Sequence, residues 1–263
     1  MAVPAYLAAS FHFKETGLIT DVNDLITAIT DELVNQNSPA WTDQGGGLFK
    51  SPPDASGRWV DILLTRIAAN NLDMRARDNL GQTICQGRMQ IQTGRVCRIF
   101  SGQFHFQVET VIPGSGAEYI RAGILDLSPE SQTAHTQWAY AHTYRTTADA
   151  VRSSTGESQL FMWDNSAYAE TGRATGFMIL TGAATYMSPS GGYIFMATHV
   201  VAKPPGEATY SCYAGRLYNH MMGDPKSVPG SEFTIPIDAG TFGTFKVSGQ
   251  QAANYSQMLL RIA

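Results

Sequence analysis

Gln103-Phe104-His105-Phe106-Gln107-Val108-Glu109 is the stretch that decides the fold class. Apolar and polar side chains alternate along it without interruption, which is typical of a β-strand with one face in the core and the other in water. A second alternating stretch, Leu72-Asp-Met-Arg-Ala-Arg77, is followed by the turn-forming residues Asp78-Asn-Leu-Gly81. Residues 83–92 then return the chain, so we expect a hairpin here.

Further β-like runs extend this pattern over most of the chain, with Gly, Pro, Asn and Ser between them. These runs are Tyr6–Phe13, Trp59–Ala68, Tyr119–Leu127, Phe177–Met187, Tyr193–Ala202, Ala208–Tyr218, Phe233–Ile237 and Phe242–Val247. Repeated alternation in short pieces favours antiparallel sheets that each keep one solvated face. The sequence therefore predicts a mainly β protein with sandwich-like sheets.

One helix interrupts the β pattern, at residues 21–35. Its apolar residues recur at the spacing of a helix and form one stripe, made of Val22, Leu25, Ile26, Ile29 and Leu33. Thr20 or Asp21 can cap its N-terminus, and Asn35-Gln-Asn-Ser-Pro39 ends it. A single striped helix predicts packing across a sheet face.

The best candidate for a domain boundary is Pro113-Gly-Ser-Gly116. It divides an α+β domain at residues 1–112, which holds the helix, from a β-sandwich-like domain at residues 113–263. Charge also differs along the chain, because residues 58–98 carry seven Arg and three Asp, a net charge of +4, so that the rest sums to -8. Complementary charge suits contact with a neighbouring protein, although Arg residues that merely face outward on strands would give the same count.

Composition excludes several classes of protein. Charged residues make up 15% of the 263 residues and hydrophobic residues 43%, which is too apolar for a disordered chain. The net charge of -4 gives no reason to expect nucleic-acid binding, and no apolar run is long enough to span a membrane. Cys85, Cys97 and Cys212 form no close pairs, and no cationic leader opens the chain, so we expect reduced thiols and folding in a cytoplasm.

The sequence contains none of the common catalytic signatures, and we expect no enzyme, no cofactor and no metal. Phosphate-binding loops, nucleophile elbows and HExxH pairs are missing. His135 and His142 are seven residues apart, which is too far on a helix and on opposite faces of a strand, so they do not suit one metal ion. His12 and His105 each stand between two Phe residues, and we expect both to point to the wetter face of their strands.

Carboxylates and aromatic residues in the second half leave two alternatives open. Asp126, Asp149 and Asp164 could serve a polysaccharide hydrolase if two of them converged in a cleft. Aromatic residues gather over residues 138–168, where they either fill a core or bind sugar rings. The candidate contact residues for a partner or a glycan are Trp138, Tyr140, Trp163, Arg75 and Arg77.

The order of segments in the second half resembles a group of virion structural proteins from the tail and baseplate region of tailed bacteriophages. The resemblance covers residues 119–247. It rests on Gly123-Ile-Leu-Asp-Leu-Ser-Pro129, Thr133-Ala-His135, His142-Thr-Tyr-Arg145, Phe161-Met-Trp-Asp-Asn165, Tyr213-Ala-Gly-Arg-Leu-Tyr218, Pro225-Lys226 and Ile235-Pro-Ile-Asp-Ala-Gly240.

The resemblance implies an assembly component of the tail, baseplate or neck, located in the virion and assembled in the host cytoplasm. Its implied partners are other virion proteins and copies of itself, with no membrane and no specific nucleic acid. A symmetric oligomer or ring would fit the low charge content, because subunit contacts then cover much of the surface. The alternatives are a module of the same particle that binds host-surface glycan and, less favoured, the hydrolase.

Overall fold

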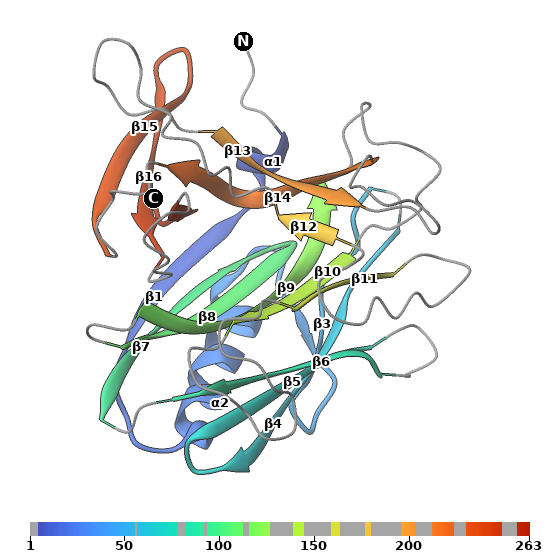
Figure 1. The fold of residues 1–263 in the computed structure, drawn as a ribbon, viewed down its shortest axis with the longest axis vertical. Coiled ribbons are helices and arrows are strands. Elements are labelled where there is room, and N and C mark those ends of the chain that lie inside the picture. Colours follow the sequence, from blue (N-terminus) through green and yellow to red (C-terminus); the bar gives the residue numbers. More distant parts are fainter. Residues whose placement is uncertain are drawn as a thin grey trace.

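The computed structural model describes residues 5–55, 57–77, 83–91, 94–112, 116–126, 139–144, 159–163, 177–179, 196–202, 212–223, 230–248 and 257–263. The chain is mainly β, with antiparallel sheets and an N-terminal helix packed on a sheet, so the predicted fold class is confirmed (Figure 1). Two sheets form in the described residues, one with twelve strands and one with five.

The helix begins with α2 (Val22–Thr30) and continues into the π-helix η1 (Asp31–Gln36). Asp21 caps it, with a side-chain oxygen 2.8 Å from the Asn23 backbone nitrogen that donates to it. Four residues of the predicted stripe are fully buried and Ile26 is partly buried, which confirms the stripe. The widened last turn was not predicted, and it lies where Glu32 is buried.

The smaller sheet runs in the order β2 (Thr42–Asp43), β3 (Leu48–Lys50), β4 (Asp61–Ala68), β5 (Asn71–Arg77) and β6 (Thr83–Gln90). β5 and β6 pair antiparallel, which confirms the predicted hairpin, while its turn lies outside the described residues. The apolar side of β5 is fully buried, as expected, but Asp73 on the other side is buried too. The interpretation of β5 as a half-exposed strand was therefore wrong at this position.

The larger sheet follows the path β1-β7-β8-β9-β14-β17-β16-β15. The bounds of these strands are β1 (Phe11–Ile19), β7 (Arg95–Gly102), β8 (His105–Ile112), β9 (Gly116–Asp126), β14 (Cys212–Gly223), β15 (Glu232–Asp238), β16 (Thr241–Val247) and β17 (Gln257–Arg261). β10 (Ala139–Tyr144) pairs with β9 and with β11 (Gln159–Trp163), whereas β13 (Met196–Ala202) joins β14 to β12 (Phe177–Ile179).

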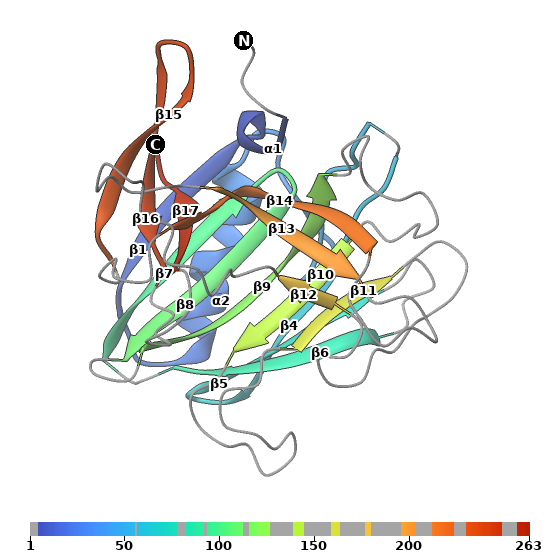
Figure 2. The ribbon, with the colours of Figure 1, turned by 45° about the horizontal axis from the view of Figure 1, so that its top comes forward.

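The large sheet curls, so that its C-terminal strands lie over the strands of its N-terminal part (Figures 1 and 2). The predicted boundary at residues 113–116 falls in the connection between β8 and β9, and these two strands pair along their length. The hydrogen-bonded sheet therefore runs across that position.

Two apolar clusters hold this arrangement. The larger cluster places α2 between the two sheets, where its stripe packs with side chains of β4, β5, β7, β8 and β9. The smaller cluster joins the short helix α1 (Ala5–Ala8) to β14, β15, β16 and β17. Residues 6–8 are thus helical, and the prediction of a strand from Tyr6 was wrong there, because Tyr6 and Leu7 pack against the curled sheet instead of pairing within it.

The predicted wet face of β8 is buried. Phe106 and Val108 point into the larger cluster, as expected, yet His105, Gln107 and Glu109 on the opposite side are at most 2% exposed. The expectation that His105 faces water was wrong, because the curled C-terminal strands cover this side of the sheet. A polar layer is consequently enclosed inside the protein.

Candidate functional site

Polar side chains from neighbouring strands form rows across the enclosed face of the larger sheet. Residues that pair directly in an antiparallel sheet project to the same face. The register aligns Glu15 with Arg98, Arg98 with Glu109, and Glu109 with Tyr119. The next line toward β14 passes through Gln107 and Arg121.

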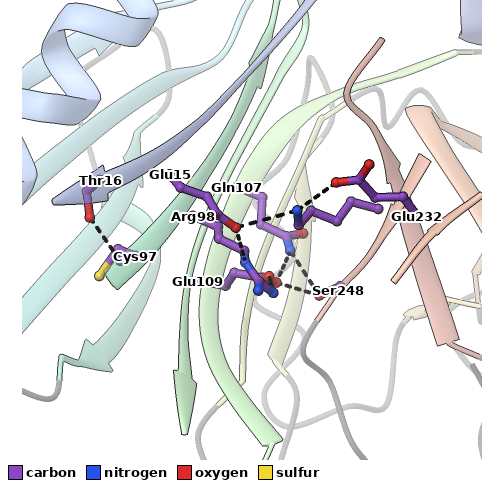
Figure 3. A network of polar contacts seen from close by, with 9 residues as sticks. Glu15, Thr16, Cys97, Arg98, Gln107, Glu109, Glu232 and Ser248 are labelled. Carbon is purple, nitrogen blue, oxygen red and sulfur yellow. Dashed lines mark hydrogen bonds and ion pairs between the residues drawn. The ribbon is translucent and has the colours of Figure 1, made fainter. Parts of the chain in front are cut away.

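At the centre of this polar seam lies the carboxylate of Glu109, which is fully buried. It accepts a hydrogen bond of 2.6 Å from the Ser248 hydroxyl and one of 3.2 Å from the Gln107 side-chain amide. The Arg98 guanidinium lies 3.5 Å away (Figure 3). A buried carboxylate is tolerated when charge and hydrogen bonds compensate it, and Glu109 receives both.

Arg98 and Lys246 connect the seam to Glu15 and Glu232, which are partly exposed; Figure 3 shows Glu15, Arg98 and Glu232. Arg98 Nε lies 3.0 Å from Glu15, and Lys246 Nζ lies 3.5 Å from Glu15 and 2.9 Å from Glu232. Burial raises the pKa of Glu15, but the hydrogen bond from Arg98 and the charge of Lys246 outweigh it, so that its pKa lies below the ordinary value. Acidic and basic groups thus alternate from β15 and β16 to β1, β7 and β8.

A pair of histidines lies in the same layer, where β8 faces β14. The rings of His105 and His220 meet edge to face with centroids 5.4 Å apart, and both are buried. Burial lowers the pKa of His105 to about 3. Burial, the neighbouring His105 and Arg121 together hold the pKa of His220 well below its ordinary value. Both rings are therefore neutral at physiological pH.

Several atoms near this pair have no hydrogen-bond partner within the described residues: His105 Nδ1, His220 Nε2, Gln107 Oε1, Asn219 Oδ1 and the Tyr140 hydroxyl. Gly123 pairs with His105 in the register, and a Cβ on Gly102 would lie 2.6 Å from the His105 ring. The ring fills the space that a side chain on Gly102 would need. The pair is thus packed into the sheet rather than open to a substrate.

A smaller polar cluster joins β1 to the π-helix. Glu32 is 1% exposed, and its carboxylate pairs with His12 Nδ1 and lies 3.3 Å from Lys14 Nζ. Lys14 also pairs with Asp31 at 3.1 Å. His12 is 40% exposed, which agrees with the prediction that it lies toward solvent. Its contact with Glu32 links β1 to the π-helix.

Among the residues predicted as contacts, the structure describes the side chains of Tyr140 and Arg75, which lie on different sheets. Tyr140 is completely buried on β10, and burial raises the pKa of its hydroxyl. Arg75 lies on β5, 42% exposed, with Nε 3.1 Å from Asp73. Arg77 and Trp163 stand on β5 and β11, with side chains outside the described set, and Trp138 lies outside the described residues.

Of the residues considered for chemistry, only some lie in the part of the chain that the structure describes. Asp126 ends β9 and pairs in register with Arg216 of β14, whereas Asp149, Asp164 and His135 lie outside the described residues. Cys97 is buried and free, and burial raises its pKa to about 12. In the part of the chain that the structure describes, no three or more His, Cys, Asp or Glu side chains are grouped to hold a metal ion. None of the described helices is long and apolar enough to cross a membrane.

Sequence reasoning missed the polar seam and the histidine pair. Glu109 and Ser248 are 139 positions apart, and neither belongs to a recognisable motif. The one available signal was the density of hydrogen-bonding residues on the polar side of β8, which is equally typical of a solvated strand.

Comparison with known proteins adds no family. A scan against protein-family models found no matching model. A search of curated proteins also found no match. The charged groups of the polar seam connect parts of one chain. Among the described residues, the exposed large apolar side chains are Leu18, Ile67, Val96 and Phe242.

Proposed function

We propose that this chain is a structural component of a tailed-phage particle, in its tail, baseplate or neck, acting through protein–protein contacts. The observation that carries the proposal is where the segments behind the resemblance lie. Those at residues 123–126, 213–218 and 235–240 lie on β9, β14 and the β15–β16 hairpin, all on one path through the larger sheet. Arg216 and Leu217 pair directly with Asp126 and Leu125.

The buried polar groups support the same proposal. The charged and polar side chains of Figure 3 bond to one another, across strands that are remote in sequence. Such a network stabilises and rigidifies the curled sheet, and a subunit that is in contact with several neighbours requires a rigid fold. Its partners would be other virion proteins and further copies of the chain, and Arg75, whose side chain is 42% exposed, is a candidate residue for such contacts.

The proposal is tested on purified particles. Mass spectrometry should find the chain in the particle at a fixed copy number, and antibody labelling in electron micrographs should place it in the tail region. Particles made without the chain should stop at an incomplete tail or neck. Complete, infectious particles without it would overturn the proposal, as would release of sugar from host envelope polysaccharide by the purified chain.

A further inference from the structure

Two exposed apolar sites occur on the described surface of the larger sheet. Leu18 and Val96 stand directly opposite each other on β1 and β7, 70% and 37% exposed. Phe242 is 61% exposed and stands opposite Pro236 near the turn of the β15–β16 hairpin. We call these the strand-end site and the hairpin-tip site.

The two sites lie toward opposite ends of the molecule. The β15–β16 turn projects at the top of Figure 1, whereas the end of β1 and the start of β7 lie near the bottom, along the longest axis. The turn also stands clear of the other strands in Figure 2. The two sites therefore do not meet within one molecule, but the hairpin tip of one copy can reach the strand end of another.

Charge beside the two sites is complementary. Arg95 is exposed next to Val96 on β7, within the segment that carries the excess of Arg. Asp238 lies two residues after Pro236 at the hairpin turn, where it is half-buried and its carboxylate accepts a hydrogen bond of 2.6 Å from the Ala239 backbone N–H. The hairpin-tip site thus has an aromatic side chain beside an acidic residue, and the strand-end site has an apolar pair beside a basic residue. Complementary charges of this kind fix the orientation of a protein–protein contact.

We propose that the hairpin-tip site of one copy docks onto the strand-end site of the next copy, head to tail. This inference rests on the proposed structural role and names the surface through which copies would join. Because the two sides of the contact differ, a chain of copies keeps one free site of each kind at its ends after every addition. These two free sites are used up only when the copies close into a ring.

The test uses two variants of the full chain that each destroy one site. Phe242→Ser removes the aromatic anchor, and Leu18→Ser places a polar group in the apolar pair. Sedimentation velocity should show oligomers for the unmodified protein and monomers for each variant alone, with association weakened roughly tenfold or more. The controls Phe242→Leu and Leu18→Met keep the sites apolar and should still associate.

Mixing the two variants gives the decisive result. The intact tip of the Leu18→Ser copy should bind the intact strand end of the Phe242→Ser copy, giving dimers and nothing larger. A mixture that stays monomeric would overturn the proposal, as would oligomers of Phe242→Ser alone or a monomeric unmodified protein at high concentration. If variants that no longer associate still enter the particle, the structural role stands without this contact. If the chain forms head-to-tail oligomers but is absent from the particle, the structural role is contradicted and the contact stands.

Discussion

Replacing His105 by asparagine should flatten the pH dependence of the protein's stability. The native pKa of His105 is about 3, against 6.5 for an ordinary histidine. The native state therefore holds this ring neutral while the unfolded chain takes up a proton near pH 6.5. Its contribution to stability is present above pH 6.5 and is lost as the pH falls toward 3.

The size of the effect follows from these two values. Between pH 7.5 and pH 5.5 the unfolded ring becomes protonated and the native ring does not, which lowers the free energy of unfolding by about 1.4 kcal/mol. His220 is shifted in the same direction, since it is buried beside His105 and Arg121. The double variant His105→Asn with His220→Asn should accordingly show a still flatter profile.

The measurement is denaturant unfolding, followed by tryptophan fluorescence at pH 5.5, 6.5 and 7.5. Unmodified protein should lose about 1.4 kcal/mol more over this range than His105→Asn does, whatever the absolute stability of the variant. Tyr140→Phe is the matched control, because it changes the same buried layer without removing an ionising group in this range, and its profile should run parallel to that of the unmodified protein. Should asparagine prevent folding, His105→Gln serves instead. Equal slopes for His105→Asn and the unmodified protein would refute a buried neutral His105.

Three further changes test other parts of the fold by the same unfolding assay. Leu25→Ala should cost about 2–5 kcal/mol, because its side chain is completely buried between the sheets, and a hydrogen-exchange profile with residues 21–35 unprotected would contradict this placement. Ser248→Ala should cost about 1.5–3 kcal/mol, since it removes a 2.6 Å bond to the buried Glu109 carboxylate, and an unchanged midpoint would mean that this bond adds nothing. Gly123→Ala should destabilise strongly, because its Cβ would lie 2.4 Å from the Phe104 carbonyl oxygen, whereas Gly17→Ala has open space and should be nearly neutral; similar losses for both would argue against this packing.

The sequence determined the elements whose signals are local. The stripe from Val22 to Leu33 gave the helix and its buried face, because helical spacing brings those residues to one side whatever surrounds them. Alternation likewise located β5 and β8, and the turn-forming residues 78–81 of the sequence predicted the hairpin that β5 and β6 make. The alternation pattern did not predict β7, β10 and β11, because apolar and polar residues alternate less regularly in these strands.

Only the tertiary structure decided what covers the second face of each strand. His105, Gln107 and Glu109 form the polar half of a regular alternation, and the same pattern serves a wet face or a buried polar layer. Which of the two occurs depends on β14 to β17, more than a hundred residues further along the chain, and on Ser248, which completes the hydrogen bonds of Glu109. A strand's period is set by its own backbone, whereas the burial of its polar side depends on how distant strands fold over it, and no local pattern records that.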